Sequence, residues 1–365
     1  MLCGLQDNGS FYNDGSAWWE VTGGDGMDNA IHPINDYVQI TSYQYGNFFL
    51  SLDQGATRNA LSFTGSGTGA WLSPVVFDPK SPDTIYFGLK NVYASYNAGA
   101  TVNSLTTGAL FPSGAISLAV APSASNVLYA GDYTRIMKST DWGHTWVNIS
   151  AGLPTFAAKT FIAVDFNDPN KVYVTFSGYS AGTKVYMTTN GITWANISTG
   201  LPNVPVNCIA VDSSSPGALF AATDMGVFYR DNTVTSWALY NTGLPNVIVD
   251  DIDINYTNYK IRVATFGRGV WECKLKKPAS TAIQQVTNAT HEIQLYPNPA
   301  VHSWKLLFSN QTPQDYSVKV TDAAGHIVQS FRNKDFIDAS GLAKGIYHIE
   351  ITSGDIHETL KGVKY

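Results

Sequence analysis

The stretch Ser139-Thr-Asp-Trp-Gly-His-Thr-Trp146 predicts a compact turn, and similar stretches recur along the chain. In such a stretch the Ser and Asp side chains suit hydrogen bonds that close a hairpin, Gly permits a positive φ, and Trp packs beneath the turn. Asp53, Asn97 and Asp141 hold the same place in three of these stretches and stand 44 residues apart. Such a recurrence indicates one structural unit per repeat. More diverged copies are Asn13–Trp18, Thr188–Trp194 and Asp231–Trp237.

Other landmarks keep the same spacing. Gly-Leu-Pro follows three of the turn stretches, at Gly152, Gly200 and Gly243. A period of about 41 to 49 residues with four short β-rich runs per unit is typical of a β-propeller, in which each repeat forms one four-stranded sheet. We therefore predict an all-β chain with about five complete propeller units between two partial ones. The first unit begins at its second strand, Leu2–Leu5, and the last, Ile252–Leu275, ends after its third.

The stretch Ser139–Trp146 resembles the Asp-box, or BNR repeat, at every fixed position. The resemblance implies that these turns join the third and fourth strands of each sheet and serve as scaffold, not as catalysts. The residues given this structural role are Ser139, Asp141, Gly143, Thr145 and Trp146 in one copy, and Asn190, Gly191 and Trp194 in the next.

A second resemblance is carried by Gly4–Ser10, Gly23–Gly26 and Ala264–Trp271, which look like the propellers of the sortilin N-terminal domain and of two-propeller xyloglucan hydrolases. It covers residues 1–275 and implies the fold. The two catalytic carboxylates of those hydrolases fall on no matching motif in this chain, so no catalytic residue is carried over. One fold hosts many functions, and activity has to be argued from the residues.

The last part of the chain has landmarks of its own at Leu295–Pro299, Val320–Gly325, Ile337–Tyr347 and Lys361–Tyr365. In that order they resemble the C-terminal sorting domain of the type IX secretion system, by which Bacteroidetes export proteins. The resemblance implies the secretion machinery as a partner and a secreted or outer-membrane surface location. Alternating apolar and polar residues predict a small antiparallel β-sandwich over 291–365. The small, polar run 276–290 is typical of a linker.

Composition excludes several classes of protein. A formal net charge of -6 without any run of Lys or Arg excludes nucleic acid as an expected partner, and no apolar stretch is long enough to span a membrane. Met1–Asp7 lacks the features of a signal peptide, so we expect that residue 1 is not the natural start. The three cysteines are expected to be buried, with Cys3 and Cys273 the one pairing left open. Only His32 and His144 precede residue 276, so we expect no metal site and no cofactor.

Candidate site residues come from one end of the predicted propeller. Turns between second and third strands share a face with the loops that lead to the next sheet. On this face Asp7 and Asp25 are the candidate general acid and base, because two facing carboxylates can cleave a glycosidic bond. The alternative is that these acids only form tight turns, as Asp-Asn-Gly sequences do. Candidate ligand-binding residues are Asp28, Asp132, Asp224, Arg268 and Trp19.

Three hypotheses for function follow. The first is a secreted or cell-surface propeller that binds a glycan or protein ligand without chemistry. The second is a glycoside hydrolase of the xyloglucanase type, acting on β-glucan or xyloglucan through paired carboxylates. The third is a structural surface protein. A cleft with two acids at working separation favours the second over the first.

Overall fold

The computed structural model describes residues 1–63, 68–276, 293–308, 315–354 and 356–365. Within these ranges the regular elements are β-strands and one short 3-10 turn, η1 (Gln44–Gly46). The chain divides into two compact units, Met1–Pro278 and Ala279–Tyr365. The predicted linker 276–290 lies, apart from Lys276, outside the described residues. No helix of the described part is long and apolar enough to cross a membrane.

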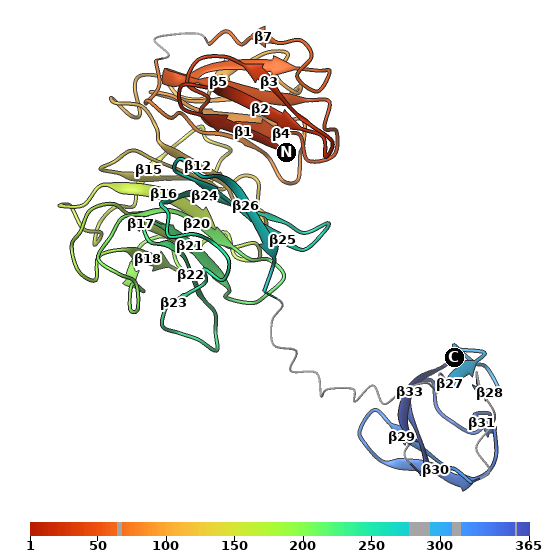
Figure 1. Cartoon of the computed structure of the whole chain (residues 1–365). Coiled ribbons are helices and arrows are strands. Elements are labelled where there is room, and N and C mark those ends of the chain that lie inside the picture. The colour runs from red at the N-terminus through yellow and green to blue at the C-terminus, as the bar shows by residue number, and fades with distance from the viewer. Residues whose placement is uncertain (64–67, 277–292, 309–314, 355) are drawn as a thin grey trace. The chain divides into compact units, whose positions relative to one another are not determined.

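The first unit holds five complete four-stranded antiparallel sheets, each built from strands in chain order (Figure 1). They are β4 Ala30–Ile31, β5 Gln39–Tyr43, β6 Asn47–Ser51 and β7 Asn59–Ala60; β8 Val75–Phe77, β9 Ile85–Gly88, β10 Val92–Ser95 and β11 Asn103–Ser104; β12 Ser117–Val120, β13 Leu128–Gly131, β14 Ile136–Ser139 and β15 Val147–Asn148; β16 Lys159–Val164, β17 Val172–Phe176, β18 Val185–Thr188 and β19 Ala195–Asn196; and β20 Val206–Val211, β21 Leu219–Thr223, β22 Gly226–Arg230 and β23 Ala238–Leu239.

Two three-stranded sheets flank these five in the chain. The first has β1 (Leu2–Leu5), β2 (Gly9–Asn13) and β3 (Trp18–Thr22), so it lacks the first strand of a unit. The last has β24 (Val249–Asn255), β25 (Lys260–Thr265) and β26 (Gly269–Lys274), so among the described residues it lacks the fourth. The prediction of five complete and two partial units in a β-propeller is confirmed.

The first strand of each unit is the inner one. Inner strands of neighbouring sheets contact one another from β4 through β8, β12, β16 and β20 to β24. Three of them carry a β-bulge near their start, between Lys159 and Ile162, Val206 and Cys208, and Val249 and Asp251. A bulge re-aims the side chains beside it, which matters for the site described below.

The Ser139–Trp146 turn is closed by its own side chains. Asp141 Oδ1 accepts from the Thr145 amide at 2.9 Å and Oδ2 from the Thr145 hydroxyl at 2.6 Å. The Ser139 hydroxyl also donates to Asp141, and Gly143 has a φ of 88°. Hydrogen bonds from Thr145 lower the pKa of Asp141 to about 2. Asp53, Asn97 and Asn190 accept the equivalent bonds in their own turns, so this network repeats from sheet to sheet.

The second unit is an antiparallel β-sandwich, as predicted. One sheet has the order β27-β28-β31 and the other the order β30-β29-β32-β33. A single core between them contains Trp304, Val318, Val320, Ile349 and Ile351. The strands are β27 Ile293–Tyr296, β28 Ser303–Phe308, β29 Ser317–Asp322, β30 Ile327–Arg332, β31 Phe336–Asp338, β32 Gly345–Ser353 and β33 Ile356–Lys364.

The three cysteines are free thiols, so Cys3 and Cys273 form no disulfide. Cys208 is buried, as expected for a small apolar residue. Cys273 is exposed on β26, and the expectation that it is buried is wrong. The missing fourth strand of the last sheet explains its exposure, because β26 is an edge strand.

Candidate functional site

Strands that alternate in direction place two kinds of connection at the same end of every sheet. These are the turns between second and third strands and the loops from each fourth strand to the next sheet. We call this end the loop face. The Ser139–Trp146 turn and its counterparts lie at the other end, the opposite face.

Asp7 and Asp25 are neighbours on the loop face, but the contact between them joins the Asp25 carboxylate to the Asp7 backbone amide. The Asp7 amide donates to Asp25 Oδ1 at 2.7 Å, and Gln44 Nε2 donates to Asp25 Oδ2 at 2.7 Å. Asp7 has a φ of 63°, as expected for the corner of a tight turn. Both oxygens of Asp25 thus hold neighbouring segments in place. This geometry favours the turn-forming role for the pair, and catalysis by Asp7 and Asp25 stays a prediction.

Asp28, in the loop between β3 and β4, is an acid of the loop face with a strongly raised pKa. Its Oδ2 accepts from the Val75 amide at 2.9 Å and its Oδ1 from the Asn29 amide at 3.0 Å. The residue is partly exposed, but surrounding chain buries its carboxyl group. Burial raises the pKa of Asp28 to about 7, and the negative charge of Asp251 contributes to this rise. The hydrogen bonds from the two amides act in the opposite direction.

Asp251 is a site residue that the sequence interpretation missed. It lies on the inner strand β24, after the bulge that follows Val249. Its side chain is reached by solvent, yet burial among the surrounding strands raises its pKa, while a hydrogen bond with the Cys208 thiol opposes the rise. Burial also raises the pKa of the Asp250 carboxyl, and Asp224 and Asp251 add to that shift. The loop face therefore carries mutually repelling acids around Asp28 and Asp251.

Asp28 is expected to make the propeller less stable as the pH rises. An Asp in the unfolded chain ionises near pH 4, whereas Asp28 in the folded chain keeps its proton to about pH 7. Between these values the folded chain binds more protons, so the free energy of unfolding falls with rising pH and levels off above pH 7. Denaturant unfolding of Asp28→Asn should show a flatter pH dependence than the wild type. Identical slopes would mean that Asp28 ionises at its ordinary pKa.

The other predicted ligand-binding residues are spread over the unit. Asp132 is tied to its own turn, because Arg135 Nη2 donates to it at 2.9 Å. Burial opposes ionisation of Asp132, but hydrogen bonds from Thr134 and Arg135 outweigh it and lower the pKa. Asp224 accepts from Asn207 at 3.2 Å on the loop face. Arg268 is exposed in the turn before β26. Trp19 lies on β3, the outermost strand of the first sheet, and packs edge-on against Tyr12.

Exposed apolar side chains are a second feature that the sequence interpretation missed. Five of the seven turns between second and third strands present one at the loop face. Three more come from two loops that lead to the next sheet. A large apolar residue beside a turn acid, as in Asp132-Tyr133 and Asp224-Met225, is the signal that could have revealed them. The set is Tyr45, Tyr133, Tyr179, Met225 and Phe266 in the turns, and Trp71, Leu72 and Phe156 in the loops.

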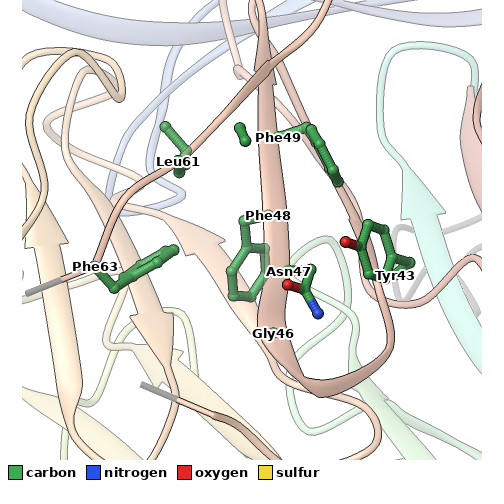
Figure 2. Close-up of a pocket in the computed structure, with 8 residues that line it drawn as sticks. Tyr43, Gly46, Asn47, Phe48, Phe49, Leu61 and Phe63 are labelled. Carbon is green, nitrogen blue, oxygen red and sulfur yellow. The ribbon is translucent and has the colours of Figure 1, made fainter. Parts of the chain in front are cut away.

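One hollow adjoins Tyr45, and a second lies toward the opposite face. The first, about 220 Å³, lies at the start of β6. In Figure 2 Phe49 lies beside Tyr43, and Phe48 lies toward Leu61 and Phe63. This hollow exists because β7 pairs only with Phe49 and Leu50, which leaves Asn47 and Phe48 without a strand on the side away from β5. The second hollow, about 310 Å³, is lined by apolar residues of the inner strands β8, β12, β16 and β20. Among the described residues, no three His, Cys, Asp or Glu side chains gather to hold a metal.

Comparison with known proteins supports the fold and the destination of the chain. The secretion system C-terminal sorting domain family matches residues 294–364. The GH74 enzyme of Niastella koreensis is 16% identical with a TM-score of 0.60, over 99% of this chain and 70% of that one. The GH74 xyloglucanase of Xanthomonas campestris is also 16% identical with a TM-score of 0.60, over 84% of this chain and 55% of that one.

YCF48 bound to D1 peptide is 11% identical with a TM-score of 0.56, over 76% of this chain and 88% of that one. No curated protein sequence matches the chain. At these identities the solved structures show a shared β-propeller fold and nothing about activity. The C-terminal unit, in contrast, is a sorting domain, which marks the chain for export by the type IX system to the cell surface or beyond it.

Proposed function

We propose that the chain is an exported β-propeller of a Bacteroidetes-type bacterium that binds a polysaccharide across its loop face, at the outer-membrane surface or after release. The observation that carries this proposal is the set of exposed aromatic and apolar side chains from five turns and two loops. Sugar rings have apolar C–H faces that pack on aromatic rings, and their hydroxyls donate to carboxylates. Both partners are present on the loop face.

The opposite face is a weaker candidate, although it also exposes apolar residues such as Tyr96 and Trp142. There the carboxylates of Asp53 and Asp141 are occupied by hydrogen bonds within their own turns. Asp25, Asp28 and Asp132 on the loop face are also hydrogen-bonded, but that face adds Asp224 and Asp250, whose negative charges repel each other. The similarity to glycan-cleaving GH74 enzymes fits a glycan ligand, whereas the similarity to YCF48 with its bound peptide fits a protein ligand.

Polysaccharide binding is expected to depend on the loop face alone. Affinity electrophoresis of the full chain through gels containing β-glucans or mannans should show retardation. Replacing the five aromatic residues of the loop face with Ala should abolish retardation, because each substitution removes an exposed ring on which a sugar can stack. These residues are Tyr45, Trp71, Tyr133, Tyr179 and Phe266. A control variant with Ala at Leu52, Tyr96, Trp142 and Ile192 changes the opposite face to a similar extent. Loss in the control instead, or binding only to peptides, would overturn the proposal.

Glycoside hydrolysis is the second candidate, favoured by Asp28 and Asp251. A general acid works best when its pKa lies near the operating pH, and the pKa of Asp28 is about 7. Asp251, whose charge acts on Asp28, supplies the second carboxylate that such a reaction needs. Asp28 would protonate the leaving oxygen and Asp251 would act as base or nucleophile.

Release of reducing sugar from β-glucans, xyloglucan included, tests this second candidate. Asp28→Asn and Asp251→Asn should each lower the rate about 100-fold or more, while Asp7→Asn leaves it unchanged. The reverse pattern would restore the sequence-based pair Asp7 and Asp25. A silent panel with retained binding would leave the non-catalytic proposal alone.

A further inference from the structure

We infer that the loop face of the first two sheets holds one neutral pyranose unit at Tyr45 and Trp71 and rejects acidic glycans. This inference rests on the proposed function and adds to it a position and a ligand class. Its carriers are the conformation of Tyr45, the pocket beside it, and the charge of the first two sheets.

Tyr45 is held in an uncommon conformation. Its φ is 67°, which is an outlier for a bulky side chain, and such outliers gather at functional sites. Both backbone groups of Tyr45 are fixed by the following loop: its amide donates to the Trp71 carbonyl at 3.1 Å, and its carbonyl accepts from the Gly69 amide at 2.9 Å. The strained turn and the loop thus fix each other and present the two rings at one place.

The two rings form a preorganised apolar corner. Their centroids are 5.3 Å apart with an interplanar angle of 88°. Tyr45 is 49% exposed and Trp71 is 43% exposed, so other protein atoms leave part of each side chain uncovered. A perpendicular pair of aromatic rings offers one face and one edge to a saturated ring of pyranose size.

Polar groups and a pocket flank this corner. Gln44, next to Tyr45, holds Asp25, and Asn47 Nδ2 donates to the Gln44 carbonyl at 2.7 Å. The pocket of about 220 Å³ begins at Gly46 and Asn47 (Figure 2). Aromatic walls with a few fixed polar groups are the usual lining of a small-ligand site. The second sheet and the loop that follows it therefore combine a stacking corner, a pocket and hydrogen-bonding groups around Gln44–Asn47.

Charge decides which glycans fit. The first 57 residues contain no Lys or Arg, but they contain seven acids, among them Asp7 and Asp25 on the loop face. The first basic residue, Arg58, donates to the Val21 carbonyl and lies over the Phe49 ring at 5.7 Å, so it already has partners. A uronate or sulfate at Tyr45 would meet this negative charge, which Lys90 in the neighbouring turn of the third sheet offsets only in part and which salt would screen. A neutral pyranose meets no such penalty.

The test compares a neutral β-glucan with polygalacturonate at low and high salt, using the full chain and isothermal titration. The double variant Tyr45→Ala/Trp71→Ala should lower the affinity for the neutral β-glucan about tenfold. Tyr96→Ala/Trp142→Ala, which removes 53% and 52% exposed rings from the opposite face, is the matched control and should have no effect. Polygalacturonate should bind the wild type weakly at low salt, and its affinity should rise as salt is added.

Charge variants complete the test. Asp7→Asn/Asp25→Asn keeps the acceptor for the Asp7 amide and should strengthen polygalacturonate binding about tenfold at low salt. Asp14→Asn/Asp53→Asn makes the same charge change on the opposite face of the same two sheets. It should fold, because Asn97 and Asn190 already serve in equivalent turns, and it should not change binding.

Two results would overturn the inference while the proposed function stands: neutral binding that survives Tyr45→Ala/Trp71→Ala, or equal binding of both glycans at low salt. Absence of any glycan binding by the wild type would overturn the inference and the proposed function together.

Discussion

Trp304→Ala is expected to stop export, because it removes the centre of the sorting domain. Trp304 is fully buried between the two sheets, with its ring 5.9 Å from that of Tyr347. Replacing a buried Trp with Ala costs about 3–5 kcal/mol. A domain of this size has only about 5 kcal/mol of stability, so the variant keeps roughly 0–2 kcal/mol and unfolds often enough to be recognised poorly and degraded. Immunoblots of periplasm, outer membrane and medium should find the variant retained in the periplasm or degraded.

Trp304→Phe and Leu307→Ala are the controls for this prediction. Within the described residues the Trp304 indole nitrogen is buried without a hydrogen-bond partner, so Phe at this position loses volume but no bond. Leu307 is on the same strand, β28, but is exposed. Both variants should be exported. Export of Trp304→Ala at the wild-type level would show that the machinery recognises the tail without a folded sandwich.

The repeat explains why the architecture could be predicted from sequence. The turn stretches around Asp53, Asn97, Asp141 and Asn190 use side chains that bond to their own backbone, so the local sequence nearly determines the local structure. Once the turns are placed, four short strands per period leave little freedom. The incomplete first and last sheets followed from the same count, and the alternating tail pattern gave the sandwich.

The site could be predicted less well, because it depends on contacts between distant segments. Asp250 and Asp251 are adjacent in sequence, and only the bulge after Val249 decides which of them the inner strand turns toward Asp28 and Cys208. A shift of one residue reverses the two faces of a strand. Tyr45 and Trp71 are 26 residues apart, and no pattern predicts that a left-handed Tyr brings them together.

Gly26→Ala is expected to damage both stability and binding, because there is no space for a side chain where the loop crosses the first sheet. A Cβ on Gly26 would overlap the Gly9 carbonyl and lie 2.8 Å from the Leu5 nitrogen, and backbone atoms cannot rotate away. The Gly26 amide also donates to the Leu5 carbonyl at 3.0 Å. Overpacking of this kind costs about 1–3 kcal/mol, or roughly 2–4 °C in Tm for each kcal/mol.

The shift of the loop that Gly26→Ala causes should also lower the affinity for the ligand, because Gly26 lies between Asp25 and Asp28, the two acids that anchor the loop. Asp25 bonds to the Asp7 amide and to Gln44, and Asp28 bonds to the Val75 amide of the third sheet. Moving the loop breaks one set of bonds or the other, so glycan affinity should fall together with Tm. Gly23→Ala is the matched control in the same loop, since its nearest neighbour is the mobile end of Glu20 at 3.4 Å. If Gly26→Ala lowered Tm but left glycan affinity at the Gly23→Ala value, the ligand would not depend on this loop, and the site would have to lie on the later sheets.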